Sequence, residues 1–446
     1  MTSLKKLAYR SAIWTIAGFG MSQVIRFGNN LILTRLLLPE YYGLMAIVNT
    51  LRMGIELFSD IGIAQSIVNN RLGDEPSFRN TAWTLQIIRG FLVCCVLLLI
   101  TVPVANLYDD SRLLWLVPIM GLSSAIDGFS STSIFTFQRR LDLGSLTRFD
   151  FTVQILAVVT MIAWAYFNPS IWALAMGVIA AAVYKAIGSH WLIRGYNNRF
   201  AWNQDALREI ISFGRLIFVA TAMMFMAEQA DRLILGKLFT LETLGVYSIA
   251  YTLASIPREV IKKLSHRVIF PAISNQADIP RSALRAKILR QRKIVILGFA
   301  VCIAALVTVG DLIIATLYDN RYSEATWMMP ILCCGIWLSV LFYTMSPALL
   351  AIKKPLYSAQ SNLARFVTIG IGLPLAFYSF GSIGAIIAIA IADLPLYIVN
   401  VWGLRQEKLS CIAQDFVGTA FFIGVLALFL FIRYSLGFGF PIQAIL

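Results

Sequence analysis

Three arginines lie inside long apolar segments of this chain, where charged side chains are unexpected. Arg26 and Arg52 fall near the middle of the first two such segments, and Arg89 falls in the third. If the segments cross a membrane, a charge that faces lipid at the bilayer centre costs at least ~2.5–3.5 kcal/mol. We therefore expect each arginine to face another helix or water, and charges in such places indicate a functional interior.

Further polar side chains recur at spacings of three and four, which places them on one face of a helix. Four segments carry such a stripe: Gln23, Arg26, Asn30 and Thr34; Asn49, Arg52, Glu56 and Asp60; Ser123, Asp127, Ser130 and Ser131; and Thr221, Glu228, Asp231 and Arg232. Two interpretations remain open. Acids and arginines four residues apart, as in Arg52–Glu56 and Glu228–Arg232, fit structural ion pairs. A water-filled cavity between two halves of the protein accounts for all the stripes together.

The composition shows what surrounds these stripes. Of 446 residues, 59% are apolar and 13% are charged, which excludes a set of soluble domains and predicts an all-α integral membrane protein. Apolar segments long enough to cross a hydrocarbon core follow one another along the chain. We expect thirteen spans, at residues 11–37, 41–68, 81–105, 113–137, 149–167, 171–193, 209–238, 242–267, 294–317, 325–351, 361–379, 382–404 and 413–433.

The net charge of +14 has a cause other than nucleic-acid binding. Membrane proteins concentrate Lys and Arg in cytoplasmic loops, and with the amino terminus in the cytoplasm 26 of them fall on that side against five on the other. The stretch 281–293 holds six of these cations. We expect it to form an amphipathic helix on anionic lipid, with capture of an anionic substrate as the alternative.

The chain also contains an internal duplication. Shifted by 202 residues, nine of the 21 positions from Leu31 to Leu51 match those from Leu233 to Leu253. Because six spans separate the copies, both start on the same side, and we expect two parallel six-helix lobes around a central cavity. The predicted lobes are residues 1–200 and 205–405, joined by the polar stretch 194–208 and followed by about one extra helix and a tail at 410–446.

Corresponding positions of the two copies carry opposite charges. Three pairs do so: Arg26 with Glu228, Glu56 with Arg258, and Asp60 with Lys262. A pseudo-twofold axis brings corresponding positions toward each other, so we predict that these pairs form across the lobes in one conformation and separate in the other. Chance drift of the charges is the alternative.

No segment has the pattern of an enzyme or of an ATP-driven pump. The sequence has no phosphate-binding glycine loop, no GxSxG element and no Cys/His cluster with metal-ligand spacing. We therefore expect no cofactor and no metal. Gradients or the substrate itself would supply the energy, and coupling to H⁺ or Na⁺ would use Asp127, Glu56 or Asp60.

Two sequence elements resemble the polysaccharide transporter family, which includes the Wzx-type oligosaccharide flippases of the multidrug/oligosaccharidyl-lipid/polysaccharide superfamily. One is Leu-x-Pro-x-x-Tyr-Gly at Leu37–Gly43, and the other is its second-lobe counterpart Asp-Arg-Leu-Ile-Leu-Gly-Lys-Leu-Phe at 231–239. The resemblance covers about residues 5–405. The family commonly has twelve or fourteen spans, so the thirteen predicted here depart from it in the extra helices.

The resemblance implies that the chain moves a polyprenyl-pyrophosphate-linked oligosaccharide from the inner to the outer leaflet of a bacterial inner membrane, by alternating access of two lobes around a cationic cavity. Guanidinium groups bind phosphate oxygens two at a time, and hydroxyl and amide groups would bind the sugars. The implied cavity residues are Arg26, Asn30, Asn49, Arg52, Arg89, Ser123, Asp127 and Ser130. The implied gating or ion-coupling residues are Glu56, Asp60, Glu228, Asp231, Arg232, Arg258 and Lys262.

Such a protein would contact membrane lipid and act as a monomer, alongside glycosyltransferases and a polymerase, in the synthesis of a surface polysaccharide such as lipopolysaccharide or exopolysaccharide. Three other functions stay open. A cation-coupled multidrug antiporter of the same superfamily would want acids without arginines in the first lobe. A glycosyl polymerase or ligase would need a larger external loop. A non-transporting assembly partner would not need a charged interior.

Overall fold

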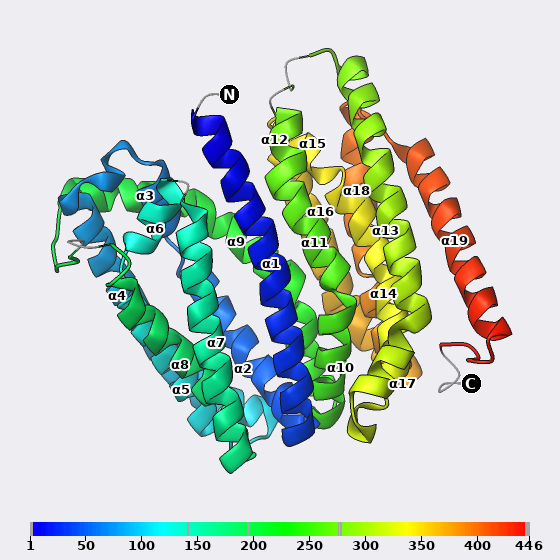
Figure 1. Ribbon diagram of the computed structural model, residues 1–446, viewed down its shortest axis with the longest axis horizontal. Coiled ribbons are helices and arrows are strands. Elements are labelled where there is room, and N and C mark those ends of the chain that lie inside the picture. Colours follow the sequence, from blue (N-terminus) through cyan, green and yellow to red (C-terminus); the bar gives the residue numbers. More distant parts are fainter. Residues whose placement is uncertain (1–2, 141, 194–196, 275, 277–278, 442–446) are drawn as a thin grey trace. The chain divides into compact units, whose positions relative to one another are not determined.

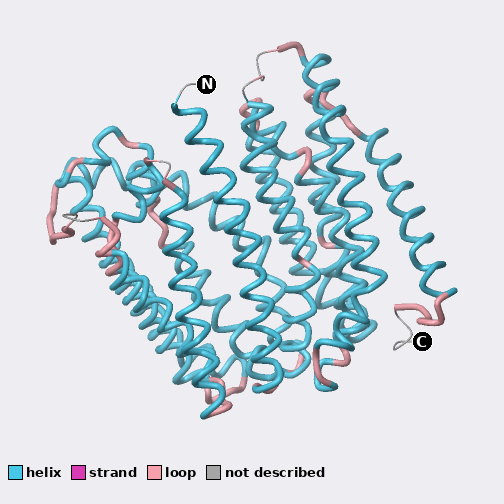
Figure 2. The backbone as a smooth tube through the Cα atoms, viewed as in Figure 1, coloured by secondary structure: helices cyan, strands magenta, loops and turns pink. Residues whose placement is uncertain are grey.

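The described part of the chain consists of helices joined by loops. The computed structural model describes residues 3–140, 142–193, 197–274, 276 and 279–441, in which there are helices and loops but no strand (Figures 1 and 2). The earlier helices are α1 (Ser3–Leu36), α2 (Pro39–Phe58), α3 (Ile63–Asn69), η1 (Arg71–Asp74), α4 (Pro76–Tyr108), α5 (Leu113–Gly128), α6 (Ser133–Arg139), α7 (Leu143–Phe167), α8 (Trp172–Ser189) and α9 (Gln204–Leu238). The later helices are α10 (Leu241–Ala254), α11 (Ile256–Leu264), η2 (Ser265–Ile269), α12 (Phe270–Ser274), α13 (Arg281–Leu317), η3 (Asn320–Tyr322), α14 (Ala325–Tyr343), α15 (Ser346–Ala351), α16 (Pro355–Val367), η4 (Thr368–Gly372), α17 (Leu373–Ile391), α18 (Asp393–Gln406) and α19 (Ile412–Ser435).

The chain divides into two compact units, Met1–Ala222 and Met223–Leu446. The lobe boundary predicted from the sequence lies at residues 200–205, whereas the division between the two units falls within the residue range of α9. The first turns of α9 account for this difference, because Ile210 lies in a hydrophobic core of the first unit together with Ile67 and Phe78.

The stretch before α9 is also held by the first unit. The backbone N–H groups of Ala201 and Asn203 donate to the hydroxyls of Thr84 and Thr81 on α4, each at 3.1 Å. Residues 201–203 of the predicted linker are therefore hydrogen-bonded to α4.

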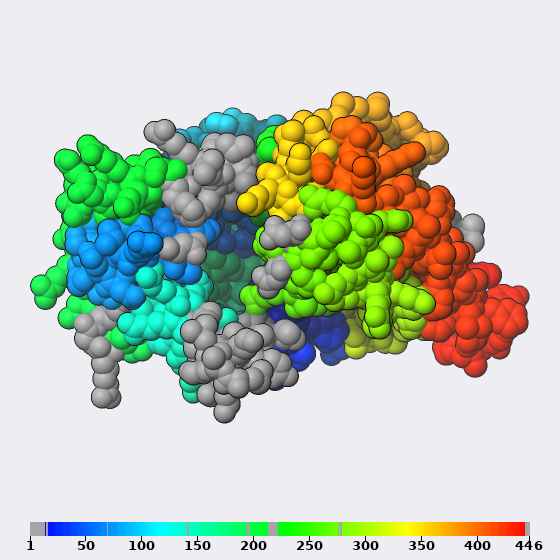
Figure 3. All heavy atoms as spheres, turned by 90° about the horizontal axis from the view of Figure 1, so that it is seen from above, coloured from blue at the N-terminus to red at the C-terminus, as the bar shows by residue number. Residues whose placement is uncertain are grey.

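Two predicted spans of the first unit are broken helices. The span 41–68 consists of α2 and α3, because Gly62 adopts the left-handed conformation (φ 67°) that glycine tolerates best, and its N–H donates to Asp60 Oδ1 at 3.0 Å. The span 113–137 consists of α5 and α6, which are bent by 62°. The sequence analysis predicted one span at each place and did not include these breaks. In Figure 3 the blue segment of α3 lies beside the cyan segment of α6, so the breaks belong to one region.

The helix α13 corrects the prediction of a separate cationic helix at 281–293. Residues Arg281–Leu317 form one continuous helix, so the cationic stretch is its first turns. Other predicted spans are subdivided: the span 242–267 contains α10, α11 and η2, and the span 325–351 contains α14 and α15. The predicted break before residue 382 coincides with a kink in α17 at Gly381, where φ is 62°.

The helices differ in how well they suit a bilayer. Within the described residues, those long and apolar enough to span it are α4, α7, Ile171–Ser189, α13, Ala325–Ala351, Pro355–Gln406 and α19, and the bent pair α5 and α6 passes the same test together. Pro355–Gln406, with 52 residues, contains two of the predicted spans. The helices α1, α2 and α9 are outside this set, and they carry three of the four predicted polar stripes. Their polarity favours faces turned to protein or water.

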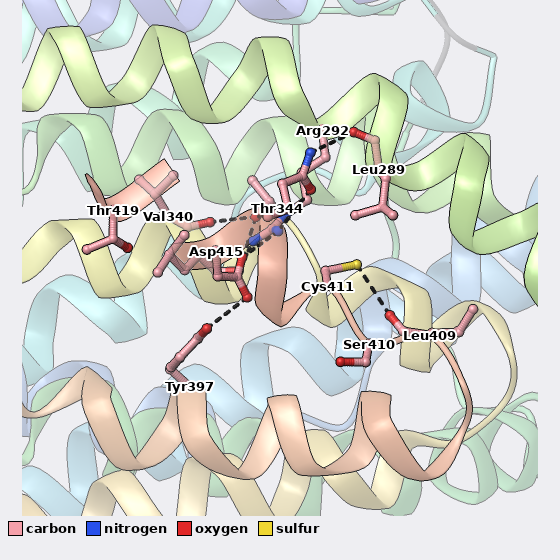
Figure 4. Close-up of polar contacts among 12 residues, drawn as sticks. Leu289, Arg292, Val340, Thr344, Tyr397, Leu409, Ser410, Cys411, Asp415 and Thr419 are labelled. Carbon is pink, nitrogen blue, oxygen red and sulfur yellow. Dashed lines mark hydrogen bonds and ion pairs between the residues drawn. The ribbon is translucent and has the colours of Figure 1, made fainter. Parts of the chain in front are cut away.

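The helix outside the duplication, α19, is attached to α13 near both of its ends. Asp415 lies 2.5 Å from the buried guanidinium of Arg292 and accepts a hydrogen bond from Tyr397 at 2.8 Å (Figure 4). Arg433 lies 2.5 Å from Asp311 at the other end, and Figures 1 and 3 show α13 and α19 side by side. Arg292 was predicted to lie on a lipid-facing helix. In the structure its ion pair with Asp415 connects the thirteenth predicted span, α19, to α13 of the repeat.

Candidate functional site: a charged pocket in the first unit

The first unit contains a polar pocket of about 250 Å³. The break between α2 and α3 forms one wall, the break between α5 and α6 forms another, and α4 and α8 complete it. Its polar lining residues are Glu56, Asp60, Gln65, Gln86, Arg89, Ser124, Asp127, Ser130, Ser131 and Lys185. Five of the predicted site residues are therefore brought together: Glu56, Asp60, Arg89, Asp127 and Ser130.

Close packing of α4 on α5 builds the floor of this pocket. A Cβ at Gly90 would lie 2.8 Å from the carbonyl oxygen of Ser124, so a larger residue would push the helices apart. Where α5 ends, the side-chain amide of Gln86 donates to the carbonyl oxygens of Gly128 (3.0 Å) and Ser130 (2.9 Å). Gln86 thus satisfies backbone acceptors that the α5–α6 break leaves without helical partners.

Glu56 is held by two neighbours. Arg52, one turn earlier on α2, donates to its carboxylate at 2.8 Å, as the ion-pair interpretation of the sequence predicted. Ser124 donates to the same oxygen at 2.6 Å. Arg52 does not line the pocket itself but neutralises a carboxylate that does.

Arg89 forms hydrogen bonds with the carboxyl-terminal end of α2. Its Nη2 donates to the carbonyl oxygen of Glu56 at 2.6 Å and its Nε donates to Ser59 Oγ at 3.2 Å. Its Nη1 lies 3.7 Å from Asp60 Oδ1, which makes a looser ion pair. Arg89 therefore combines a fixed position with a positive charge at the pocket wall.

Lys185 is the charged pocket residue that sequence reasoning missed, and Gln65, Gln86 and Ser124 are the uncharged polar ones absent from the predicted site. Lys185 Nζ lies 2.8 Å from Asp127 Oδ1 and 3.1 Å from Oδ2, and the two side chains are 39% and 44% exposed. A signal for it was present, because Lys185 is the one charged residue in the apolar segment that forms α8. Ser130 donates weakly to Asp127 at 3.4 Å.

The other predicted cavity residues lie elsewhere in the first unit. Ser123 is buried, and its hydroxyl donates to the Met120 carbonyl of its own helix at 2.7 Å, so it is not available to a ligand. Arg26 on α1 has an exposed side chain, whereas Asn30 and Asn49 are half-buried, and none of the three lines the pocket. Their predicted role in binding stays a prediction.

The second unit uses the corresponding charges differently. Glu228 lies 2.5 Å from Lys262, and Arg232 instead donates to Gln229 at 2.6 Å, so the predicted pair Glu228–Arg232 is absent from the described contacts. Asp231 is buried and accepts from the Tyr247 hydroxyl at 2.6 Å. These side chains have partners within their own unit.

At the centre of this second-unit network is Asp393, which the sequence analysis did not identify. Its Oδ1 lies 2.9 Å from Arg365 Nε and 3.6 Å from Arg258 Nη2, close enough for ion pairs although neither contact has hydrogen-bond geometry. Ser339 donates to its other oxygen. All four of these side chains are buried. Four helices, α11, α14, α16 and α18, thus meet around these buried side chains.

The described part of the chain holds no group of three or more His, Cys, Asp or Glu side chains close enough to bind a metal ion. The six cysteines are free thiols. What the first-unit pocket can do chemically is bind a polar, charged group through ammonium, guanidinium, hydroxyl and amide donors.

The sequence matches the model of a family described as polysaccharide biosynthesis protein over residues 32–327. The chain belongs to this family. Two bacterial relatives are the teichuronic acid biosynthesis protein TuaB of Bacillus subtilis (strain 168), 20% identical over 77% of this chain and 70% of its own length, and the lipopolysaccharide biosynthesis protein WzxC of Escherichia coli (strain K12), 18% identical over 74% and 67%.

Solved structures show the fold of this polysaccharide biosynthesis protein. The lipid II flippase MurJ in its inward closed conformation matches with a TM-score of 0.67, 12% identity, and coverage of 93% of this chain and 99% of its own. An inward-facing multidrug resistance MATE family transporter of the MOP superfamily matches with a TM-score of 0.68, 11% identity, and coverage of 87% and 95%. The predicted two-lobed, all-helical membrane fold is confirmed.

Together the comparisons give a multi-pass membrane protein of a polysaccharide biosynthesis family, with the fold that MurJ and the MATE transporter share.

Proposed function

We propose that this protein moves a polyprenyl-pyrophosphate-linked oligosaccharide from the inner to the outer leaflet of a bacterial inner membrane, for the synthesis of a surface polysaccharide. Family membership and relatives named for polysaccharide biosynthesis support this proposal. So does the likeness in fold to MurJ, which is named a lipid II flippase. The predicted orientation, with the amino terminus in the cytoplasm, gives the direction.

The observation that carries the proposal is the presence of two cations, Arg89 and Lys185, at a pocket inside a membrane protein. A pyrophosphate brings about two negative charges, and burial of each costs several kcal/mol without a partner. A guanidinium binds phosphate oxygens in a bidentate manner, and an ammonium acts as a point charge on a flexible stem. Ser130, Ser131 and Gln65 supply hydroxyl and amide groups of the kind that sugars need.

In the proposed cycle the two lobes alternate in opening a cavity to either side, while the polyprenyl tail stays in lipid. Arg26, Asn30, Asn49 and Arg52 would add cationic and amide groups to the lining of that cavity. The cross-lobe pairs predicted from the duplication would form in a different conformation, since Glu56, Asp60, Glu228, Arg258 and Lys262 each have a partner in their own unit here.

Energetics favour outward movement of this cargo. Carrying negative charge outward across an inside-negative membrane releases about 2.3 kcal/mol per charge per 100 mV. Coupling to H⁺ or Na⁺ through Asp127, Glu56 or Asp60 would add to this drive. The proposed transporter contacts membrane lipid, acts as a monomer, and receives its cargo from glycosyltransferases and delivers it to a polymerase.

The alternative, a cation-coupled multidrug antiporter, is supported by the likeness to the MATE transporter. A site for a cationic drug would present carboxylates to the ligand. In the first unit each pocket carboxylate already has a cation: Arg52 for Glu56, Arg89 for Asp60 and Lys185 for Asp127. No carboxylate of the described pocket lining is therefore left without a cation for a drug to neutralise.

Deletion of the gene followed by lipid extraction tests the proposal. We expect the cytoplasmic leaflet to accumulate polyprenyl-linked oligosaccharide and the surface polymer to disappear. The wild-type gene and an Arg148→Gln variant, whose cation lies on α7 of the same unit and makes no described ion pair, should restore the polymer. A Lys185→Gln variant should not. Unchanged polymer together with new sensitivity to cationic drugs would favour the antiporter.

A further inference from the structure

The contact between Lys185 and Asp127 carries an inference about how cargo binds and leaves. We propose that Asp127 is a built-in competitor of the cargo: its carboxylate occupies Lys185 in the empty pocket, and the diphosphate of the cargo must displace it. The inference rests on the proposed function in taking the anion to be a diphosphate.

The geometry shows that Asp127 takes the place of an anionic ligand. Lys185 Nζ contacts both carboxylate oxygens, at 2.8 and 3.1 Å. An ammonium has three N–H donors, so this double contact leaves little donor capacity for another anion. Both side chains line the pocket and are well exposed, at 39% and 44%, so a ligand in the pocket can reach either of them.

Arg89 provides the contrast that makes Lys185 the exchangeable cation. Two nitrogens of Arg89 donate to Glu56 O and Ser59 Oγ, which fixes the guanidinium to the end of α2. Lys185 has no described contact of this kind with the backbone, and its charge sits on a four-carbon stem. A diphosphate would therefore meet a stationary charge at Arg89 and would take over a movable one from Asp127.

The exchange has a consequence for transport. A carrier must bind its cargo strongly enough to collect it and weakly enough to release it. A carboxylate that reclaims Lys185 as the cargo leaves lowers affinity and favours release. Asp127 is in this sense an affinity-setting residue, and its removal should tighten binding while slowing turnover.

Asp150 offers a matched control. It lies on α7, close enough to interact electrostatically with Lys185, but it does not line the pocket and makes no described hydrogen bond to Nζ. Asp150→Asn removes a negative charge near Lys185 but leaves the carboxylate of Asp127 in contact with Nζ.

The test uses the purified full-length chain in detergent and titration calorimetry with farnesyl diphosphate, with farnesol as the uncharged control. We expect Asp127→Asn to bind farnesyl diphosphate about tenfold tighter than wild type, which corresponds to about 1.4 kcal/mol. Asp150→Asn should change affinity less than about twofold. Asp127→Ser should behave as Asp127→Asn does, and melting curves should show that each variant is folded.

The double variant Asp127→Asn with Lys185→Gln separates competition from simple repulsion. If Asp127 competes for Lys185, its removal gains nothing once Lys185 is gone, so the two effects should be strongly non-additive. The same tightening in both backgrounds, or none in either, would overturn the inference. Farnesyl diphosphate that binds wild type and every variant no better than farnesol would instead count against the proposed function of the pocket.

Discussion

The two units place similar charges in opposite environments. In the first unit the ion pairs of Glu56, Asp60 and Asp127 border a pocket and have side chains that are 19–44% exposed. In the second unit Arg258, Arg365 and Asp393 come from three helices, α11, α16 and α18, and their side chains are at most 8% exposed. Half-exposed ions can change partners at little cost, whereas buried ions cannot be left unpaired. Under the proposed function the first unit carries the ligand-binding pocket, whereas in the second unit buried ion pairs join helices.

Elsewhere the duplication keeps the same detail in both copies. In the turn before α5, the N–H of Arg112 donates to Asp110 Oδ1 at 2.8 Å, and the guanidinium pairs with the same carboxylate. In the turn after α13, the N–H of Arg321 donates to Asp319 Oδ1 at 3.0 Å, with a matching ion pair. This turn is therefore one place where the two units make the same kind of contact.

The largest expected difference in stability between the two units is at Asp393. Asp393→Asn leaves the guanidinium groups of Arg258 and Arg365 buried without a counter-charge, and we expect a loss of about 3–5 kcal/mol of stability. Asp60→Asn in the first unit is the matched control and should lose less than about 1 kcal/mol, because Asp60 is partly exposed and its ion pair is loose. Thermal unfolding in detergent measures both. Equal losses would remove the distinction between the units.

The attachment of α19 sharpens the same point. Asp415→Asn alone should destabilise the protein by about 3 kcal/mol, since Arg292 stays buried with its charge uncompensated. Replacing both members by apolar residues, Arg292→Met with Asp415→Leu, should recover most of the loss. Thermal unfolding of the single and double variants checks this. If the double variant is as unstable as the single one, the ion pair itself stabilises the attachment of α19. The loss would then not come from a buried, unpaired Arg292.

A smaller effect is expected at Ser124, which bridges α5 to Glu56 of α2. Ser124→Ala removes a 2.6 Å hydrogen bond to a half-exposed carboxylate, and we expect a loss of about 1 kcal/mol. Because Arg52 still neutralises Glu56, transport should fall by less than about threefold. Thermal unfolding and polymer yield measure the two effects, and loss of transport without loss of stability would place Ser124 in cargo binding.

The smallest effect concerns pH, in the turn of Asp110 and Arg112. Partial burial raises the pKa of the Asp110 carboxyl, but hydrogen bonds and the charge of Arg112 outweigh it and hold the pKa below its usual value. The resulting stabilisation is present above the pKa of the unfolded chain and is lost as pH falls through the folded pKa. It should amount to less than about 1 kcal/mol, because the pair is partly exposed. Unfolding curves of wild type and Arg112→Gln should converge in acid.

The sequence predicted the membrane fold and much of the first-unit site. Hydropathy and the duplication were sufficient for the fold, and helical spacing singled out Glu56, Asp127 and Ser130. The helix breaks were missed although turn-forming residues mark both of them. Ser59, Asp60 and Gly62 lie at the first break, and Gly128 with the polar stretch 130–133 lies at the second. Lys185 and Asp393 were missed because each stands alone in an apolar segment, so that no spacing pattern marked it. The role of each residue depends on partners from other helices, Asp127 for Lys185 and the two arginines for Asp393.

Lipid translocation by the purified protein in vesicles tests the central claim most directly. Vesicles would carry a fluorescent polyprenyl-diphosphate saccharide, and a membrane-impermeant quencher would report how much of it reaches the outer leaflet. We predict translocation by wild type and Arg148→Gln, and a rate at least about tenfold lower for Lys185→Gln with unchanged melting. Equal rates for all three proteins, or a wild-type rate no faster than that of protein-free vesicles, would contradict the account.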